Sequence, residues 1–429
     1  MNKPIEASTL INSGKTKLVY EVRGEPSEVF VCSKDDMTAG DGKRHDVVPG
    51  KGAMSNMTTS NVFKFLLTCG LPVAFIKQVD DTTFRAKKCN MLPLEIVCRR
   101  RAVGSFIERN PHVPKLTVFP CLDYALFLKT SGKKWMDKDI PVDDPLMKIN
   151  EESVDLFDPH KPIHGQKPFL AIPLDSIIGK QSPSLLSCIE MIARKTFLVL
   201  EKAYQLTGFE LVDFKIEVGF DDRGVLRIAD VIDAESVRLM RDGKHYDKQP
   251  YREDGLNPIV MERFAEVRDA TSRFMLPNQR IIIWTGSKDD VISGIEDAVQ
   301  TMSENTIGTD RIICSAHKSP VHAFLGLVAC SQSNPDAVII AKIGMSNGAG
   351  PTLSANTMLP VITIPANHED HPEDIASCLR TPSKVPVMTM LSEKNAALAA
   401  LQILAMHNPL LYAILRQELE KRLVNVVSF

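Results

Sequence analysis

The sequence predicts a chain of two domains, an α+β domain followed by an α/β domain with a doubly wound parallel sheet. Its 429 residues exceed the size at which one hydrophobic core usually stops growing. The first part contains strand patterns that turn back on themselves, which is typical of antiparallel sheets. In the last third, short apolar runs alternate with helical segments, which predicts parallel strands with helices on both faces. We therefore expect domains over residues 1-255 and 279-429, with a linker and helix over residues 256-278.

Composition limits the kind of protein. The chain is 44% apolar and 24% charged, as in an ordinary globular protein. Its net charge of −2 provides no general field for nucleic acid or a membrane surface. The nine cysteines form no CxxC pair, which argues against a disulfide framework or a structural zinc site. The N-terminal residues lack the pattern of a signal peptide, and no apolar run approaches the ~20 residues of a membrane span. We expect a cytoplasmic, soluble protein that binds neither nucleic acid nor membranes.

The central pattern of the first domain is the stretch of residues 211–238. In its first half the even positions are apolar, whereas the odd positions carry Asp213, Lys215 and Glu217. This two-residue period is typical of a half-buried strand. A turn-forming DDRG sequence and a second β-rich run follow, so we expect a hairpin. If its turn is even-membered, Lys215 lies opposite Asp230, with the other two charged residues on the same face.

The chemistry of this face allows two interpretations. Converging carboxylates can hold Mg²⁺ through oxygen ligands while a lysine neutralises a phosphate or a substrate carboxylate. The alternative is the solvated face of an amphipathic hairpin. Ser236 and Arg238, just beyond the second β-rich run, do not decide between the two.

Two earlier segments have the residue types of an anion site. Gly14, Lys15 and Lys17 precede an apolar run and can fold over nucleotide phosphates, although their spacing is not that of a P-loop. An exposed basic turn would have the same composition. Arg99 lies near the end of a predicted strand that runs into Ser105, where arginine forks suit a phosphate or a carboxylate. Alternatively, Arg99 and the two arginines that follow it form a solvated patch.

The rest of the first domain is predicted to pack around these segments. Residues 51–67 and 184–206 have the pattern of helices, the second with one clearly apolar face. Residues 111–175 are irregular and rich in proline, so we interpret them as an excursion from the core that carries Lys129 and Asp144.

Each predicted strand of the second domain ends in a polar loop. Ligands of doubly wound sheets bind at the carboxyl ends of the strands. The loop residues are therefore candidate ligands: Ser287, Asp290, Ser315, Lys318, Ser346, Asn347 and Gly348. His317 can move a proton near neutral pH, although a single loop histidine is more often a surface residue. His368 and His371 are interpreted as loop residues and not as metal ligands.

Nine short motifs occur in order along the chain. They are GKTKLVY, DDMTAGD, CRRRAVGS, LVDFKIEVG, ADVIDAESVR and DKQPYR in the first domain, then GSKDD, SAHK and SNGAGP in the second. Together they resemble the bifunctional animal family of purine synthesis in which phosphoribosylaminoimidazole carboxylase is fused to phosphoribosylaminoimidazole-succinocarboxamide synthase. The resemblance implies antiparallel sheets around a nucleotide cleft in the synthase domain and a three-layer sheet in the carboxylase domain.

For the first domain, the resemblance implies an ATP- and Mg²⁺-dependent ligase. In this family the carboxylate of carboxyaminoimidazole ribonucleotide is phosphorylated and then attacked by the amine of L-aspartate. By resemblance, Gly14, Lys15 and Lys17 bind the nucleotide, and Glu217 and Asp230 hold the metal and the nucleotide. Substrate contacts are implied for Arg99, Ser105, Arg238, Ser236, Lys129 and Asp144, and catalytic positions for Asp213 and Lys215.

For the second domain, the resemblance implies addition of CO₂ to aminoimidazole ribonucleotide without biotin or ATP. The electron-rich ring is the nucleophile, so the protein needs only to confine CO₂ and move a proton, for which His317 is the candidate. The family also implies a homo-octamer assembled through the carboxylase domains.

The sequence departs from the family's pattern in both domains: in the first, Lys129-Thr130-Ser131 stands where the family has KDD and residues 234–238 also differ, and in the second, two positions differ. Asp289 stands where GSxSD has its second serine, and Met345 stands where GRSNG has arginine. If both line a phosphate pocket, a full charge at ~4 Å is worth on the order of 4 kcal/mol at an effective dielectric near 20. A second hypothesis therefore stays open: a diverged relative with an impaired carboxylase site, or a non-catalytic binding or structural oligomer.

Overall fold

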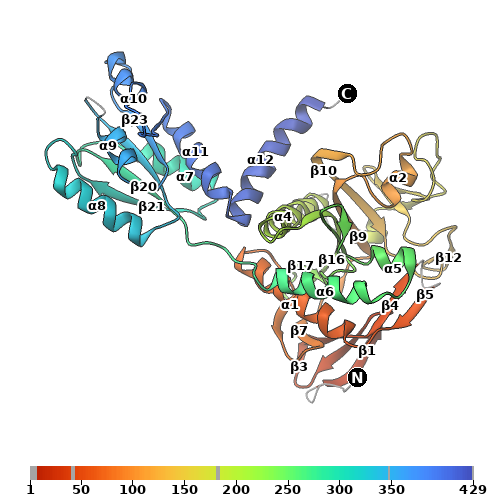
Figure 1. Ribbon diagram of the computed structural model, residues 1–429. Coiled ribbons are helices and arrows are strands. Elements are labelled where there is room, and N and C mark those ends of the chain that lie inside the picture. Colours follow the sequence, from red (N-terminus) through yellow and green to blue (C-terminus); the bar gives the residue numbers. More distant parts are fainter. Residues whose placement is uncertain (1–6, 40–43, 180–183, 346–347, 428–429) are drawn as a thin grey trace. The chain divides into compact units, whose positions relative to one another are not determined.

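The computed structural model describes residues 7–39, 44–179, 184–345 and 348–427. Its contacts divide the chain into two compact units, each described here by itself (Figure 1). The first unit contains Met1–Met275 and Glu420–Phe429, and the second contains Leu276–Leu419.

A five-stranded antiparallel sheet in the order β1-β2-β3-β7-β6 forms one part of the first unit. Its strands are β1 (Ala7–Ser13), β2 (Lys17–Val22), β3 (Glu25–Ser33), β6 (Phe75–Gln78) and β7 (Thr83–Lys87). Helix α1 (Lys51–Thr68) packs on this sheet through Phe63, whose ring centroid lies 6.1 Å from that of Phe75 and 6.2 Å from that of Phe84. The turn between β1 and β2 carries Gly14 and Lys15, so the sheet fixes where the predicted nucleotide loop lies.

A larger antiparallel sheet has β16 near its centre (Figure 1). Its order is β15-β14-β13-β10-β9-β16-β18-β19, and β8 and β17 pair with the far end of β16. Its strands are β8 (Asn90–Met91), β9 (Leu94–Arg101), β10 (Val118–Leu128), β13 (Leu146–Ile149), β14 (Ser153–Phe157), β15 (Leu170–Pro173), β16 (Glu210–Phe220), β17 (Leu226–Ala229), β18 (Val237–Arg241) and β19 (Lys244–His245). Because β16 pairs with four other strands, its side chains are held in fixed positions on both faces of the sheet.

The interpretation of residues 111–175 as an excursion from the core is wrong. Strands β10, β13, β14 and β15 lie in this segment and extend the larger sheet, and Leu128, Val154 and Leu156 are 0% exposed. Prolines concealed these strands, because proline cannot donate to a strand ladder and occurs at its irregularities. Pro120 lies at such a place, where the pairing of β10 with β9 shifts register.

The hairpin between β16 and β17 exists, but its register differs from the expected one. Phe220 pairs with Leu226, which leaves an odd number of residues in the turn. The prediction that Lys215 lies opposite Asp230 is therefore wrong. Lys215 pairs with Val97 of β9 instead.

Helices cover the sheets of the first unit. Phe197 of α4 (Ser184–Leu206) packs edge-on against Phe214 of β16, with ring centroids 5.3 Å apart. Helix α6 (Pro258–Thr271) packs on α1 and contributes Val260 and Val267, both 0% exposed. The short elements of this unit are β4 (Asp36–Ala39), β5 (Arg44–Val47), β11 (Lys134–Trp135), β12 (Lys138–Asp139), α2 (Ser105–Arg109), α3 (Asp175–Ile178) and α5 (Gln249–Asp254).

The second unit contains a five-stranded parallel sheet in the order β21-β20-β22-β23-β24. Its strands are β20 (Arg280–Thr285), β21 (Gly308–Ile313), β22 (Val338–Ile343), β23 (Val361–Pro365) and β24 (Met388–Thr389). This order is that of a doubly wound fold, in which the strand order reverses between β20 and β22.

Helices cover both faces of the parallel sheet, so the predicted three layers are confirmed (Figure 1). Ile281 and Ile283 of β20 face a core formed with α7 and α11, whereas Ile282 and Trp284 face a core formed with α8 and α9. The helices of this unit are α7 (Ser293–Met302), α8 (Pro320–Ser333), α9 (Ala349–Ala355), η1 (Pro372–Ile375), α10 (Ala376–Leu379) and α11 (Glu393–Ala405), and the residues of α12 (Pro409–Val427) up to Leu419 also belong to it. In the described part of the chain, no helix is both long and apolar enough to span a membrane.

Candidate functional sites

The middle of β16 carries three charged side chains, each of which has a partner of opposite charge. Asp213 and Glu217 are only 4% and 5% exposed, although they occupy the face that an amphipathic hairpin would turn to water. Lys215 between them pairs with Glu95 of the neighbouring strand β9. Buried charges are retained in proteins only when they are paired or bind a ligand. The solvated-face alternative is therefore wrong for Asp213 and Glu217 in this layer of charges, whereas the side chain of Lys215 between them is 40% exposed.

Arginines surround Asp213 at one end of this layer. Arg238 of β18 pairs with Asp213, and the Nε of Arg99 lies 3.7 Å from the same carboxylate. Arg99 also donates from Nη1 to Asp123 at 2.9 Å. The guanidinium of Arg238 packs against Gly104, where an added Cβ would lie 2.9 Å from Nη2 and where φ is 57°. Both the backbone conformation and the close approach favour glycine at this position.

Lysines pair with carboxylates at the other end of the layer. Lys17 of β2 pairs with Asp230, and Lys129 pairs with Glu217. Burial lowers the pKa of Lys17 to about 8, although Glu217 acts in the opposite direction. Asp230 follows β17 with a left-handed backbone, φ 66°. The structure thus brings together the predicted nucleotide lysine and the two predicted metal carboxylates.

Asp144 lies near the same layer. Its carboxylate accepts a hydrogen bond from the backbone N–H of Thr130 at 2.8 Å. Burial raises the pKa of Asp144, and both this hydrogen bond and the nearby Lys215 oppose the increase. The segment of residues 129–144 therefore reaches the charges on β16, as its predicted site residues require.

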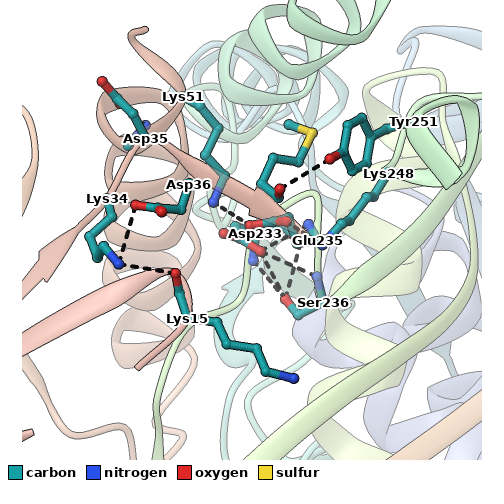
Figure 2. Close-up of polar contacts among 12 residues, drawn as sticks. Lys15, Lys34, Asp35, Asp36, Lys51, Asp233, Glu235, Ser236, Lys248 and Tyr251 are labelled. Atoms are coloured by element: carbon teal, nitrogen blue, oxygen red, sulfur yellow. Dashed lines mark hydrogen bonds and ion pairs between the residues drawn. The ribbon is translucent and has the colours of Figure 1, made fainter. Parts of the chain in front are cut away.

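A second cluster of charges lies beside Ser236, in the loop between β17 and β18 (Figure 2). Glu235 pairs with Lys51 at the start of α1 and with Lys248 at 2.6 Å. Lys51 is 1% exposed. Burial acts to raise the pKa of Glu235, but the two lysines more than offset it and the pKa is lowered. The hydroxyl of Ser236 donates to the carbonyl of Asp233 at 3.1 Å, so the loop that carries Ser236 is held at both sides.

Lys15 lies close to this cluster in the turn between β1 and β2 (Figure 2). The N–H of Gly14 donates to the carbonyl of Lys17 at 2.9 Å, which closes the turn. The carbonyl of Lys15 accepts from Lys34 Nζ at 3.3 Å, and its own side chain is exposed. The predicted nucleotide loop is therefore a tight turn with one exposed and one paired lysine.

The strand-end loops of the second unit meet around Gly344. A Cβ built on Gly344 would lie 3.9 Å from Asp290 Oδ1 and 3.6 Å from Asn367 Nδ2. Asp290 also accepts from the N–H of Ser287 at 2.8 Å. The loops after β20, β22 and β23 thus converge at the carboxyl end of the sheet, as expected for the switch point of a doubly wound fold.

The substituted residue Asp289 contacts a predicted substrate residue. The hydroxyl of Ser287 donates to Asp289 Oδ2 at 3.3 Å, and the N–H of Asp289 donates back to Ser287 Oγ at 3.2 Å. Asp289 is exposed, and Met345 is 79% exposed. Because solvent screens an exposed charge, Asp289 would repel a bound phosphate far less strongly than a buried carboxylate would.

His317 lies exposed in the neighbouring loop after β21. In the same loop, the N–H of Lys318 donates to Ser315 Oγ at 3.2 Å. Gly348 precedes α9 as its N-cap residue. Two predicted substrate residues lie outside the described residues: Ser346 and Asn347.

The histidines after β23 belong to a turn, as expected. His368 Nδ1 lies 2.8 Å from the carbonyl of Pro365, and His371 Nδ1 lies 3.3 Å from Glu373. Within the described ranges, no group of three or more His, Cys, Asp or Glu side chains is arranged to hold a metal ion.

Comparison with known proteins agrees for both units. A family model described as SAICAR synthetase matches residues 10–267, and one described as AIR carboxylase matches residues 280–423. The "Probable multifunctional protein ADE2" of Caenorhabditis elegans is 33% identical over 98% of this chain and 95% of that protein. The chain belongs to the bifunctional SAICAR synthetase/AIR carboxylase family. The human "Bifunctional phosphoribosylaminoimidazole carboxylase/phosphoribosylaminoimidazole succinocarboxamide synthetase" is 32% identical over 94% of this chain and 91% of that protein.

Solved structures resemble the SAICAR synthetase domain. The phosphoribosylaminoimidazole-succinocarboxamide synthase of Ehrlichia chaffeensis has a TM-score of 0.50 and 25% identity, and it covers 61% of this chain and 98% of that one. A structure described as "SAICAR synthetase (Type-2) in complex with ADP" has the same TM-score and identity over 61% of this chain and 97% of that one.

In the SAICAR synthetase domain, the sequence predicted both members of three charge pairs, Asp213–Arg238, Lys17–Asp230 and Lys129–Glu217, but only one member of two others, those of Lys215 and Arg99. The missed residues are Glu95, Asp123, Lys51, Glu235, Lys248 and Arg109. A sequence signal was available for Glu95, because this acidic residue lies between Leu94 and the apolar residues that follow it in the predicted strand. Glu235 was present in the ADVIDAESVR motif, but nothing in its local sequence indicates that two distant lysines reach it.

Proposed function

We propose that the SAICAR synthetase domain joins L-aspartate to the carboxylate of carboxyaminoimidazole ribonucleotide, using ATP. The substrate carboxylate attacks the γ-phosphorus of ATP, and ADP leaves. The aspartate amine then attacks the acyl carbon, phosphate leaves, the amine loses a proton, and the amide forms. The layer on β16 carries this proposal, because arginines meet it at one end and paired lysines and carboxylates at the other. Phosphoryl transfer requires mainly positioning and neutralisation of charge.

Glu217 and Asp230 are the residues that we propose to hold Mg²⁺. Magnesium usually keeps several waters and binds one or two carboxylates together with substrate phosphates, so a pair of carboxylates fits it. Lys129 and Lys17 neutralise this pair in the ligand-free protein. A bound cation would replace the lysines at the carboxylates and leave their ammonium groups to contact the nucleotide phosphates. The similar structure described as a complex with ADP supports a nucleotide in this domain.

At the arginine end, we propose that Arg99, Ser105 and Arg238 hold the ribonucleotide. Asp213 lies between the two arginines and fixes their direction. Lys215, Asp144 and Ser236 belong to the same proposed substrate site. The two ends of β16 thus separate the ribonucleotide from the ATP while the strand between them keeps their spacing constant.

We propose that the AIR carboxylase domain adds CO₂ to carbon 4 of aminoimidazole ribonucleotide without biotin or ATP. The ring supplies the electron pair of the new carbon–carbon bond, and its displaced proton goes to a base, for which His317 is the candidate. Convergence of the loops around Gly344 supports a ligand at this end of the sheet. The alternative, an impaired carboxylase, is favoured by one observation: Asp289 engages the hydroxyl of Ser287.

We also propose a cytoplasmic homo-octamer assembled through the AIR carboxylase domains. The exposed apolar side chains of α8 support contact with a second copy, because Val321, Phe324 and Leu325 are 68%, 52% and 58% exposed. The nine cysteines are free, which suits a reducing compartment. Sedimentation velocity of the full chain measures the assembly, and a monomer at micromolar concentration would contradict it.

Two assays on the full chain test the proposed function. The first measures ATP-, Mg²⁺- and L-aspartate-dependent amide formation from carboxyaminoimidazole ribonucleotide, and the second measures carboxylation of aminoimidazole ribonucleotide in bicarbonate. Activity in both is the expected result. Amide formation alone would establish the impaired carboxylase, and no activity in either assay would overturn the proposal in favour of a non-catalytic oligomer.

A further inference from the structure

Arg109, the last residue of α2, is a buried arginine that the proposed function does not use. It is 5% exposed, and its Nη1 donates to Ser105 Oγ at 3.0 Å. Its guanidinium carbon lies 6.0 Å from the ring centroid of Phe106 and 5.5 Å from that of Phe127. Two aromatic rings and one hydroxyl therefore form its described surroundings.

The charge of Arg109 is not balanced by a close carboxylate. Across the described ranges of the chain, no acidic side chain lies within ion-pair distance of it, and its one described hydrogen bond goes to a hydroxyl. Arg100 is buried to a similar degree, 7% exposed, but it donates to Glu201 at 2.6 Å and to Glu420 at 2.8 Å. Burial and, after it, the like charge of Arg99 lower the pKa of Arg109 to about 10, although the charges of Asp123 and Glu108 act in the opposite direction, so Arg109 remains protonated at neutral pH. A buried, unbalanced charge is costly and is retained where a ligand supplies the counter-charge.

The surroundings of Ser105 have an excess of positive charge. Arg99 and Arg238 form ion pairs with Asp123 and Asp213, whereas Arg109 forms none with a described residue, and the carboxylates of Asp123 and Glu108 act on it only from beyond ion-pair distance. Arg99 is 3% exposed, yet its Nε has no hydrogen-bond partner.

The hydroxyl of Ser105 is oriented by this arrangement. Since Ser105 Oγ accepts from Arg109, its own proton points away from that guanidinium and is available to an incoming acceptor. A charged donor on the oxygen also polarises the O–H bond and makes it a stronger donor.

We propose that Arg109 is a positioning residue that supplies the unbalanced charge of this pocket and aims the Ser105 hydroxyl at the phosphate monoester of the ribonucleotide. The inference rests on the proposed SAICAR synthetase function for the identity of the substrate. A phosphate dianion bound at Ser105 balances the charge of the pocket. Binding of the ribonucleotide therefore offsets the free-energy cost of burying the charge of Arg109. Without the ligand, the protein keeps a buried charge that has no carboxylate within ion-pair distance among the described residues.

The test compares Arg109→Met, which keeps length without charge, with Arg109→Lys, which keeps charge without the planar fork. We expect Arg109→Met to raise the KM for carboxyaminoimidazole ribonucleotide by roughly 10- to 100-fold. The KM for ATP should change less than about twofold, because no phosphate of ATP meets this pocket. Arg109→Lys should recover part of the loss. Arg101→Gln, a neighbouring and more exposed arginine paired with Glu210, is the matched control and should leave both KM values unchanged.

Thermal unfolding separates this role from a structural one. Without ligand, Arg109→Met should unfold at the temperature of the wild type or above it, because it removes an unbalanced charge. Arg100→Met should unfold at a lower temperature, because it removes the positive charge that pairs with both Glu201 and Glu420. A large decrease for Arg109→Met, together with equal effects on the KM values of both substrates, would overturn the inference.

Peptide-resolved hydrogen exchange makes the inference testable even if the protein has no synthetase activity. Inorganic phosphate should slow exchange in residues 99–110 of the wild type and of Arg101→Gln, but not of Arg109→Met. If the wild type is inactive and phosphate still protects these residues, the proposed function fails and the pocket stands. If the wild type is active and Arg109→Met is protected like the wild type, the pocket inference fails and the function stands.

Discussion

The two domains hold their candidate site residues in different ways. In the SAICAR synthetase domain, Asp213, Glu217 and Lys51 are 4%, 5% and 1% exposed, and each pairs with an opposite charge. In the AIR carboxylase domain, His317 and Asp289 are exposed and lie on loops after strands. The candidate residues of the synthetase domain thus include charges buried in its core, whereas His317 and Asp289 of the carboxylase domain lie on exposed loops.

This difference shows where stability and activity are coupled. A site made of buried ion pairs keeps its geometry before the ligand arrives, but removal of one partner leaves an unpaired charge in the interior. Exposed loop residues are screened by solvent and contribute little to stability. We expect substitutions in the synthetase site to change stability and activity together, and substitutions in the carboxylase loops to change activity alone.

The largest effect is expected for Glu235→Gln, which leaves Lys51 and Lys248 as two like charges without their shared carboxylate. The free energy of unfolding of the first unit should fall by ~3–5 kcal/mol. Urea unfolding followed by circular dichroism measures this change. The second unit is followed separately through the fluorescence of Trp284, which is fully buried, in a Trp135→Phe background.

The double variant Lys51→Met with Glu235→Gln is the control for this prediction. It removes one of the two like charges, so part of the lost stability should return. An unchanged unfolding curve for Glu235→Gln would show that the buried cluster is not what holds the loop of Ser236. A shift in the Trp284 transition would show that the two units do not unfold independently.

Glu217→Gln is expected to affect activity next most strongly. It keeps the shape of a residue that we assign to Mg²⁺ but removes its charge, so the synthetase kcat should fall by roughly 100- to 1,000-fold. Carboxylation by the same protein should not change. Glu210→Gln, on the same strand but paired only with Arg101, should keep the wild-type kcat. Full synthetase activity in Glu217→Gln would place the metal ligands elsewhere.

The charged layer on β16 could be predicted because alternation along one strand assigns residues to a face without any knowledge of the rest of the fold. Asp213 and Glu217 were found in this way. The residue opposite Asp230 was not predicted correctly. The register of the hairpin depends on how many residues its turn contains, and one residue more or fewer changes every cross-strand partner. The contact of Glu235 with Lys51 and Lys248 could not be predicted from the sequence either, since these residues meet only after distant segments have packed.

In the second domain, the apolar runs predicted four of the five strands and the polar loops after them. The two-residue strand β24 was missed, because so short a segment carries no periodicity. The meeting of loops around Gly344 follows from the parallel topology. The contact between Ser287 and Asp289 does not follow from topology, because it depends on the side-chain rotamers within one loop.

Asp289→Ser combined with Met345→Arg tests whether the exposed loops are impaired. The double substitution releases the Ser287 hydroxyl from Asp289 and restores a cation. Since both positions are exposed, we expect the carboxylase kcat/KM to rise by about tenfold, and not by the factor that a buried charge would give. Thermal stability should stay the same, and so should synthetase activity. No change in carboxylation would show that these positions do not line the phosphate pocket, and a large change in stability would contradict the comparison of the two domains.

The smallest effect is expected for Asp36→Asn, because this carboxylate, like Glu235, contacts two basic side chains but lies nearer to solvent. It pairs with Lys34 at 3.2 Å and with His45 at 2.6 Å, and His45 is 51% exposed. The hydrogen bond from His45 lowers the pKa of Asp36. A carboxyl group with a lowered folded-state pKa stabilises the protein above its unfolded-state pKa, and this contribution is lost as the pH falls through the folded-state pKa. At pH 7, Asp36→Asn should therefore be less stable than the wild type by no more than ~1 kcal/mol. The difference should disappear in acid, once Asp36 is protonated in both states. Urea unfolding at the two pH values measures it, and a loss as large as that of Glu235→Gln would show that burial is not what separates the two clusters.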